Sequence, residues 1–359
     1  MAQPDPLSLQ GARESRVVQC GGCGLLYLNP MPEGAELAAF YPDEYYDRVV
    51  GGTDPGRPMS PARQMRLWIR QALLQRFYGY PCAANGSTPP WDGVPGWVAT
   101  IGAHLERWRL RAGGRESAII PFMEPGRLLD VGCGTGRELI ALQAAGWRVT
   151  GVEISPYAAA VVRARLGCEV VVGHFDEAHL EGRQFDAVRL SHVLEHLPSP
   201  RRSLEKIRGL LRPGGLLWIE VPNAASLERH LFRGHWFQWN QPGHLYHFTP
   251  ETLVRLLGEV GFRPRRVKCD ARKAFFAESV ADLLQRRLGV PRRAGKTLAV
   301  LARPLVYLLG AVSLGGILTV HAVREDREPA AAAAPPGSGR PLARIDHEDT
   351  VNNPGLPNH

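Results

Sequence analysis

Residues 127–136 read Arg-Leu-Leu-Asp-Val-Gly-Cys-Gly-Thr-Gly, and this stretch decides the fold. A short apolar run, 127–131, ends in three closely spaced glycines, so we predict a buried strand followed by a tight turn. Residues 137–145 then suit a helix that stops at Gly146. A glycine turn between a strand and a helix lets a ligand approach the backbone, and the amides at the helix start favour an anionic group.

Strand and helix signals alternate from this stretch to about residue 270. We predict strands at 149–154, 169–172, 185–190 and 216–221, and helices at 155–166 and 201–211. Ser155-Pro156 supplies an N-cap and an N1 proline, and Thr249-Pro250 opens another helix. Such alternation predicts an α/β fold with a parallel sheet and crossover helices.

The rest of the chain divides by composition. We predict a short N-terminal module at 1–50, with a Cys-x-x-Cys turn and an aromatic segment at 40–46, and a linker with a helical extension at 51–120. The extension should hold helices at 62–77 and 98–111. The α/β domain should span 121–327 with a lid-like insertion at 223–248, and 328–359 should form a disordered tail, since it is rich in alanine, proline and polar residues.

Composition and charge exclude some classes of function. The net charge is +8, but only four of the 43 basic residues are lysines and the arginines are scattered along the chain. Nucleic-acid binding is therefore disfavoured, because it rewards a single basic stripe. The six cysteines form no regular disulfide framework and residues 1–15 contain no apolar leader, so we expect a soluble protein of the reducing cytoplasm.

The spacing of the glycines indicates the class of ligand. Gly132, Gly134 and Gly136 give G-x-G-x-G, whereas the dinucleotide fingerprint is G-x-G-x-x-G. Glu153 stands 21 positions after Gly132 and ends the second strand, where a carboxylate can accept hydrogen bonds from both ribose hydroxyls. Asp130 would repel a pyrophosphate but attract an ammonium or sulfonium group. The pattern favours a sulfonium nucleoside over a dinucleotide.

Residues 127–221 resemble the core of class I methyltransferases that depend on S-adenosyl-L-methionine (SAM). The resemblance rests on 129–136, on Glu153, on Phe185-Asp186-Ala187-Val188 and on Leu211-Arg212-Pro213-Gly214-Gly215. It implies a methyltransferase enzyme with a Rossmann-like seven-stranded sheet and SAM as its cofactor, in which Cys133 is a packing residue. The cofactor-binding residues implied are Asp130, Gly132, Cys133, Gly134, Gly136, Glu153, Ile154, His174, Phe175, Ser191 and His192.

The candidates for catalysis follow the fourth predicted strand. His192, Glu195 and His196 have side chains able to remove a proton from a hydroxyl, and the insertion at 223–248 adds His244 among several aromatic residues. Three interpretations stay open: a structural role, a general base or substrate ligand, and a divalent-metal site. Some ubiquinone-type and RNA-end methyltransferases hold a metal with a similar Glu-His pair, although His192 stands where several of them have Glu.

Two further segments carry separate hypotheses. Cys20 and Cys23 form a Cys-x-x-Cys turn that resembles half of the zinc-ribbon-like element of a bacterial methyltransferase subgroup, but residues 1–19 contain no first pair. They are weak zinc candidates, and no other metal site is predicted. Residues 304–320 carry no charge. We predict a helix to 309 and a last strand at 317–323, with a peripheral membrane contact as an alternative because arginines precede the segment.

Together these patterns predict O-methylation of a small molecule or saccharide. The alternatives are a non-catalytic SAM-binding regulatory module and a nucleic-acid or protein methyltransferase. The identity of the acceptor and the oligomeric state do not follow from the sequence.

Overall fold

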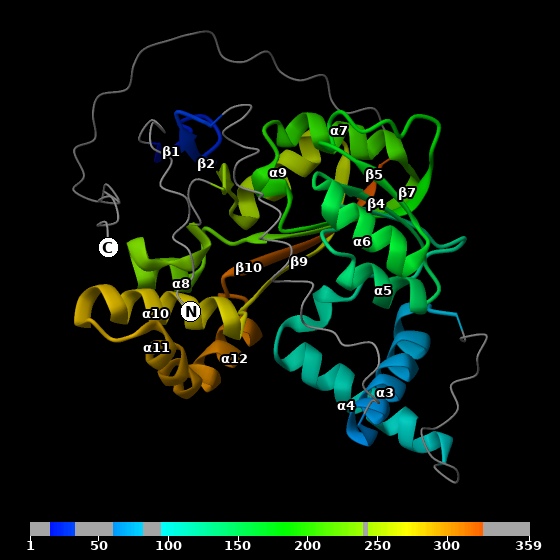
Figure 1. Cartoon of the computed structure of the whole chain (residues 1–359), viewed down its shortest axis with the longest axis horizontal. Helices are drawn as coiled ribbons and strands as arrows, with labels where there is room; N and C mark the ends of the chain where they lie inside the picture. Colours follow the sequence, from blue (N-terminus) through cyan, green and yellow to red (C-terminus); the bar gives the residue numbers. More distant parts are fainter. Residues whose placement is uncertain (1–14, 33–59, 82–94, 240–242, 326–359) are drawn as a thin grey trace.

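A seven-stranded sheet forms the core of the protein (Figure 1). The computed structural model describes residues 15–32, 60–81, 95–239 and 243–325. The strands run in the order β5-β4-β3-β6-β7-β10-β9, and β10 alone is antiparallel to its neighbours. The predicted Rossmann-like α/β fold is therefore confirmed. The strands are β3 (Arg127–Val131), β4 (Arg148–Glu153), β5 (Glu169–Val172), β6 (Phe185–Ser191), β7 (Leu211–Pro222), β9 (Phe262–Asp270) and β10 (Ile317–Arg324).

Crossover helices connect the parallel strands. The predicted N-cap at Ser155 is present, since its side chain accepts a hydrogen bond from the Ala158 amide at 3.2 Å. Thr249 and Thr252 form a capping box at the start of a second helix. The crossover helices are α5 (Arg137–Ala144), α6 (Pro156–Leu166), α7 (Pro200–Leu210) and α9 (Pro250–Glu259).

Two parts of the sheet differ from the predictions. The helix predicted to reach Leu211 ends at Leu210, and β7 already begins at Leu211, five residues earlier than predicted. The Pro213-Gly214-Gly215 segment bulges within β7, because Phe185 pairs with Leu211 whereas Ala187 pairs with Leu216. Strand β9 was not predicted, since it is an edge strand that carries charged residues and Pro264 in place of an apolar run.

Smaller elements surround the sheet. The predicted helical extension forms α3 (Pro61–Tyr78), α4 (Gly96–Ala112) and the short 3-10 helix η1 (Arg115–Ala118). In Figure 1, α10 (Lys273–Leu288), α11 (Arg292–Leu298) and α12 (Arg303–Ala311) gather on the side away from α6 and α7. The aromatic segment at 40–46 and the predicted tail at 328–359 lie outside the described residues.

A second, three-stranded sheet joins the N-terminal module to the insertion. It consists of β1 (Arg16–Gln19), β2 (Leu26–Asn29) and β8 (Tyr246–His247) in that order. The insertion also contains α8 (Leu227–Phe232) and the 3-10 helices η3 (Arg233–His235) and η4 (Phe237–Trp239). Residues more than 200 positions apart in the sequence thus share one sheet.

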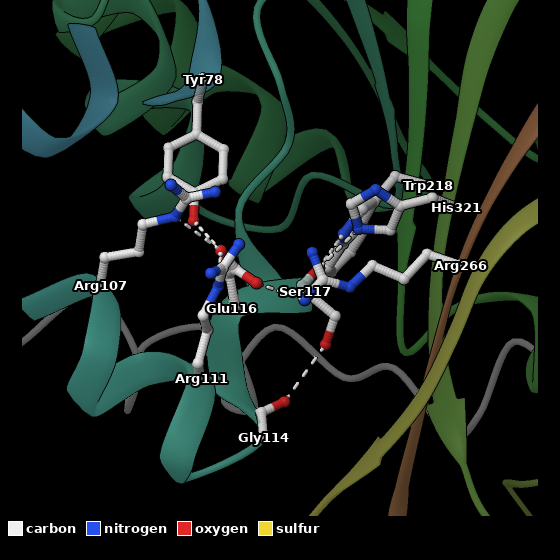
Figure 2. A network of polar contacts seen from close by, with 9 residues as sticks. All are labelled: Tyr78, Arg107, Arg111, Gly114, Glu116, Ser117, Trp218, Arg266 and His321. Atoms are coloured by element: carbon white, nitrogen blue, oxygen red, sulfur yellow. Dashed lines mark hydrogen bonds and ion pairs between the residues drawn. The ribbon is translucent and has the colours of Figure 1, made fainter. Parts of the chain in front are cut away.

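A buried carboxylate fixes the helical extension to the main sheet (Figure 2). Glu116 accepts hydrogen bonds from the Tyr78 hydroxyl at 2.7 Å and from Arg107, Arg111 and Arg266 at 3.1, 2.9 and 2.6 Å. Burial opposes its charge, but the hydrogen bonds from Arg266, Tyr78 and the other arginines outweigh this and lower the pKa of Glu116 to about 2.

The next residue completes this attachment. The Ser117 carbonyl accepts hydrogen bonds from Trp218 Nε1 at 3.0 Å and from His321 Nε2 at 2.7 Å (Figure 2). Because Trp218 lies on β7 and His321 on β10, the main-chain turn of η1 is held against these two strands of the sheet.

We expect Glu116→Gln to reduce the free energy of unfolding by about 3 kcal/mol near neutral pH, because three guanidinium groups lose their shared carboxylate. A depressed pKa stabilises the fold above the ordinary carboxyl pKa, and the stabilisation disappears as the pH falls toward 2. The difference between wild type and variant, measured by urea denaturation, should therefore shrink below about pH 4. A pH-independent difference would contradict this assignment.

Candidate functional site

The glycine loop lies where the order of strands reverses, between β3 and β6. Ligands of open α/β sheets bind in the crevice at such a switch point. Gly132, Gly134 and Gly136 have φ angles of +67°, +54° and +76°. A Cβ on Gly132 would lie 2.6 Å from Val193 and one on Gly136 would lie 2.9 Å from Val162, whereas a Cβ on Gly134 would meet nothing within 4 Å. The loop is therefore packed at its two ends and open in the middle.

Glu153 joins this loop to the next one. Its carboxylate accepts hydrogen bonds from the Gly134 amide at 2.7 Å and from the Ser155 amide at 3.1 Å, and the residue is buried. The predicted ribose-binding acid thus lies directly beside the open glycine, as a nucleoside site between β3 and β4 requires.

Asp130 has a different partner from the one that its charge suggested. Its carboxylate forms a buried ion pair with Arg189 of β6 at 2.8 Å, and Arg189 also lies 5.1 Å from the centre of the Trp218 ring. From its position in the sequence, Asp130 is expected to attract a cation of the ligand. In the structure the carboxylate holds the two central strands together, which the scattered arginines gave no reason to expect.

The remaining cofactor candidates lie at the ends of β4, β5 and β6. Ile154 is half-buried after β4, and His174 is exposed whereas Phe175 is buried after β5. The Phe175 carbonyl accepts a hydrogen bond from Lys206 Nζ at 2.6 Å. Ser191 is the last residue of β6. All of them thus end or follow strands at the same edge of the sheet as the glycine loop.

Cys133 is a packing residue in the structure. A Cβ on Gly151 would lie 2.7 Å from its sulfur, so the thiol occupies the space that this glycine leaves. Burial, together with the nearby Asp130 and Glu153 carboxylates, raises the pKa of the Cys133 thiol. A protonated, enclosed thiol is not a nucleophile.

His192 lies on the same side of β6 as a chain of charged groups. It has a φ of +55°, and its Nδ1 and Nε2 lie 3.3 Å from Glu195 Oε1 and 3.5 Å from Glu220 Oε1. Glu220 also pairs with Arg272, which donates to Asp270 at 3.0 Å. Burial opposes the charge on His192, but its contacts with Glu195 and Glu220 outweigh it and raise the pKa to about 9. An imidazolium is not a general base, so the structure disfavours that role for His192.

Glu195, His196 and His244 lie close together in the structure, although His244 is 48 positions after His196 in the sequence. One ligand atom of each lies within 4.8 Å of those of the other two. The rings of His196 and His244 meet edge to face at 4.7 Å. The residues named separately as catalytic candidates therefore form one cluster, which we call the Glu-His-His cluster.

Hydrogen bonds orient both imidazoles of this cluster. His196 Nδ1 lies 2.8 Å from the Gly243 carbonyl and His244 Nδ1 lies 2.8 Å from the Gln238 carbonyl. Because a carbonyl can only accept, each Nδ1 carries the proton and each Nε2 carries a lone pair. Burial lowers the pKa of both histidines, which keeps the rings neutral. Glu195 is fully buried, and its Oε2 has no hydrogen-bond partner among the described residues.

The insertion and the N-terminal sheet hold His244 in place. The Leu245 amide donates to the Glu195 carbonyl at 2.8 Å, and the Leu28 amide donates to the Leu245 carbonyl at 2.9 Å. A main-chain ladder therefore runs from β2 through the insertion to the loop after β6. The other insertion histidines lie elsewhere: His230 is exposed, His235 pairs with Asp282 at 2.9 Å, and His247 is buried with its pKa lowered to about 3 by burial.

Sequence reasoning predicted Ser191 but missed the charged groups that line a cavity of about 250 Å³ beside the crevice. Its walls include Arg70 of α3, Glu138 of α5, and Arg189, Ser191, Glu220 and Arg272 from the sheet and the loop after β9. Both guanidinium and carboxylate groups line it, a combination that suits an amino-acid zwitterion. Each charged group lies on a different element, so no local pattern in the sequence connects them.

The zinc hypothesis for Cys20 and Cys23 stays a prediction. The two residues flank a tight turn in which the Gly24 amide donates to the Cys20 carbonyl at 2.8 Å. Within 15–32, 60–81, 95–239 and 243–325, the three-ligand group that could hold a metal is the Glu-His-His cluster and does not include these cysteines.

Comparison with known proteins identifies the domain. Residues 103–267 match the model of a family described as a methyltransferase domain. Ubiquinone biosynthesis O-methyltransferases of Aromatoleum aromaticum and Xanthomonas campestris are 34% and 36% identical over 112 and 103 residues. These matches cover 30% and 27% of this chain and 47% and 43% of the relatives, so the chain spans less than half the length of the curated relatives it matches.

Residues 103–267 of the chain thus form a methyltransferase domain. SAM is its cofactor. Among solved structures, a SAM-dependent methyltransferase from Archaeoglobus fulgidus is similar at a TM-score of 0.41 and 22% identity, over 62% of this chain and 94% of that one.

We expect Glu153→Gln to weaken SAM binding roughly 10- to 100-fold, because a neutral amide replaces a carboxylate that can accept from both ribose hydroxyls. Isothermal titration calorimetry would measure the change. Glu169→Gln is a matched control, because that exposed carboxylate starts β5 and pairs with Arg183. An unchanged Kd for Glu153→Gln would remove this residue from the site.

Proposed function

We propose that the protein transfers the methyl group of SAM to an oxygen atom of a small-molecule acceptor, and that the Glu-His-His cluster prepares this oxygen. The observation that carries the proposal is the convergence of a buried carboxylate and two neutral imidazoles on the loop that follows β6. This loop touches the glycine loop, since Val193 occupies the space beside Gly132. A hydroxyl bound at the cluster is thus next to the cofactor crevice.

The chemistry explains why such a cluster is useful. Methyl transfer is an in-line displacement at a methyl group bound to positive sulfur, so alignment and exclusion of water supply much of the catalysis. A hydroxyl must in addition lose its proton to become a good nucleophile. The neutral imidazoles and the carboxylate of the Glu-His-His cluster can accept this proton directly. They can also hold a cation that lowers the pKa of the acceptor hydroxyl. The printed names of the two relatives support an oxygen acceptor.

The cluster also fits a divalent cation. Glu195 Oε2 is a buried oxygen without a hydrogen-bond donor, and both imidazoles donate their Nδ1 protons to carbonyls, which is the arrangement of metal-binding histidines. Glu195, His196 and His244 would hold the ion, which would act as a Lewis acid toward the acceptor oxygen. His192 lies against Glu195 Oε1 and would orient the carboxylate.

The surroundings favour an acceptor with a flat ring. The ring of Phe275 at the start of α10 meets His192 edge to face at 5.5 Å and stacks with Phe237 at 5.9 Å. Aromatic side chains of this kind bind phenols and sugar faces. The cavity lined by Arg70, Arg189 and Glu138 suits the amino-acid end of SAM. We also propose a reducing, cytoplasmic environment, which is supported by the free state of the five cysteines among the described residues.

We expect His244→Ala to reduce methyl transfer at least about 100-fold while SAM affinity stays within about 2-fold. The measurement is release of S-adenosylhomocysteine with a panel of phenols, catechols and saccharides. His230→Ala is the matched control, because it changes an exposed histidine of the same insertion. Equal turnover in both variants would contradict the proposal.

Chelation distinguishes the two roles of the cluster. If a cation is bound, exhaustive chelation abolishes turnover and a divalent salt restores it in the wild type but not in His244→Ala. Full turnover in chelator, with loss of activity in His244→Ala, would assign the cluster to proton removal alone. Binding of SAM without turnover of any acceptor class would favour the regulatory alternative.

A further inference from the structure

The helical segment Arg292–Ala311 is unusually apolar for the surface of a protein. It comprises α11, the 3-10 helix η5 (Ala299–Ala302) and α12. By length and composition it is the one helix among the described residues that could cross a membrane, with a mean hydropathy of 1.2, yet only 28% of it is buried in the fold. Most of this segment therefore faces outward.

Two apolar stripes run along different faces of the segment. The inner stripe packs toward α10 and consists of Gly295, Ala299, Val306 and Leu309, all of them buried. The outer stripe consists of Leu298, Leu301, Leu305 and Leu308, with exposed fractions of 51%, 80%, 42% and 55%. These are spaced three or four residues apart and share one face. A surface helix normally carries polar residues there, so the outer stripe is an apolar face without a partner among the described residues.

The charged residues of the segment itself are all basic. No Asp or Glu occurs between positions 283 and 324, whereas Arg286, Arg287, Arg292, Arg293, Lys296 and Arg303 lie in or just before the segment. Arg286, Arg292 and Lys296 pair with Glu278 or Asp282 of α10. Arg287, Arg293 and Arg303 are exposed and have no ion pair with the described carboxylates. An anionic surface complements this arrangement, whereas a second copy of the same face would repel it.

A neighbouring helix also exposes apolar side chains. The C-terminal end of α4 meets α12, since Tyr307 Oη lies 3.5 Å from the Arg109 carbonyl. The outer face of α4 exposes Trp97, Ile101, Leu105 and Trp108, also spaced three or four residues apart. Figure 1 shows both helices on the lower side of the molecule. Tryptophan is typical of side chains that rest at the boundary between lipid and water.

We propose that this surface docks on an anionic lipid bilayer, with Arg292–Ala311 lying in the plane of the interface. The segment does not cross the bilayer, because its inner stripe is committed to the fold: a Cβ on Gly295 would lie 2.9 Å from the Ala281 backbone of α10. Arg303 also stands near its middle, where a spanning helix would place it in hydrocarbon. Leucines on one face with arginines beside them form an interfacial anchor.

Flotation of the full chain with lipid vesicles tests the proposal. We expect the protein to float with vesicles of phosphatidylcholine and phosphatidylglycerol, to stay behind with pure phosphatidylcholine, and to be released as salt rises. Absence of flotation with anionic vesicles at low salt would overturn the proposal, and so would equal binding to neutral vesicles.

Variants with two or three surface substitutions test whether the outer stripe and its arginines contact the lipid. Leu301→Gln with Leu308→Gln should reduce the bound fraction roughly tenfold. Replacing Arg287, Arg293 and Arg303 by Gln should remove the preference for anionic lipid. The matched control, Leu227→Gln with Leu231→Gln, changes two exposed leucines of α8 and should bind like the wild type.

Two further readouts keep the result unambiguous. Thermal unfolding shows that each variant is folded, and light scattering reports the oligomeric state. If the control pair loses binding equally, the α11–α12 face is not the docking surface. If the Leu301 and Leu308 changes convert a dimer to a monomer and leave flotation unchanged, the occupant is a second copy and the proposal is wrong.

Discussion

The whole site depends on one close approach, that of the loop after β6 to the loop after β3. Gly132 lacks a side chain where Val193 needs the space, since a Cβ there would lie 2.6 Å from Val193. This contact exists because β3 and β6 are paired parallel strands, so the loops that follow them start side by side at one edge of the sheet. The cofactor loop therefore lies next to the loop that carries Glu195 and His196.

The second constraint is long-range. The cluster is completed by His244 only because Leu245 bonds to the backbone of Glu195 and, on its other side, to Leu28 of β2. The N-terminal module thus has a defined structural role, whether or not its cysteines bind zinc. It supplies the strand that holds the insertion over the loop after β6.

The sequence predicted what is encoded locally. The glycine loop, the position of Glu153 and the N-caps at Ser155 and Thr249 depend on spacings of a few residues, and the structure has them in place. Edge strand β9 was missed because it has no apolar run. Arg189, Glu220 and Arg272 were missed because each acts through a partner on another strand or loop, and an arginine-rich chain gives no sign of which arginines are buried.

The partner of Asp130 shows the limit of reasoning from charge alone. A carboxylate beside the glycine loop was expected to attract the cations of SAM, but Arg189 already neutralises it. The preference for a cationic ligand must therefore come from the whole region. Five buried carboxylates lie at or just beyond the carboxyl ends of the central strands or on the neighbouring strand β9, namely Asp130, Glu153, Glu195, Glu220 and Asp270.

Several fixed cations lie among these carboxylates. Arg189 and Arg272 are paired with three of them, and His192 lies between Glu195 and Glu220. Arg115 also faces Asp270 and Glu220. Since an isolated buried charge is costly, these cations stabilise the buried carboxylates. A pyrophosphate would still be repelled by the carboxylates beside the glycine loop, whereas the sulfonium of SAM would not.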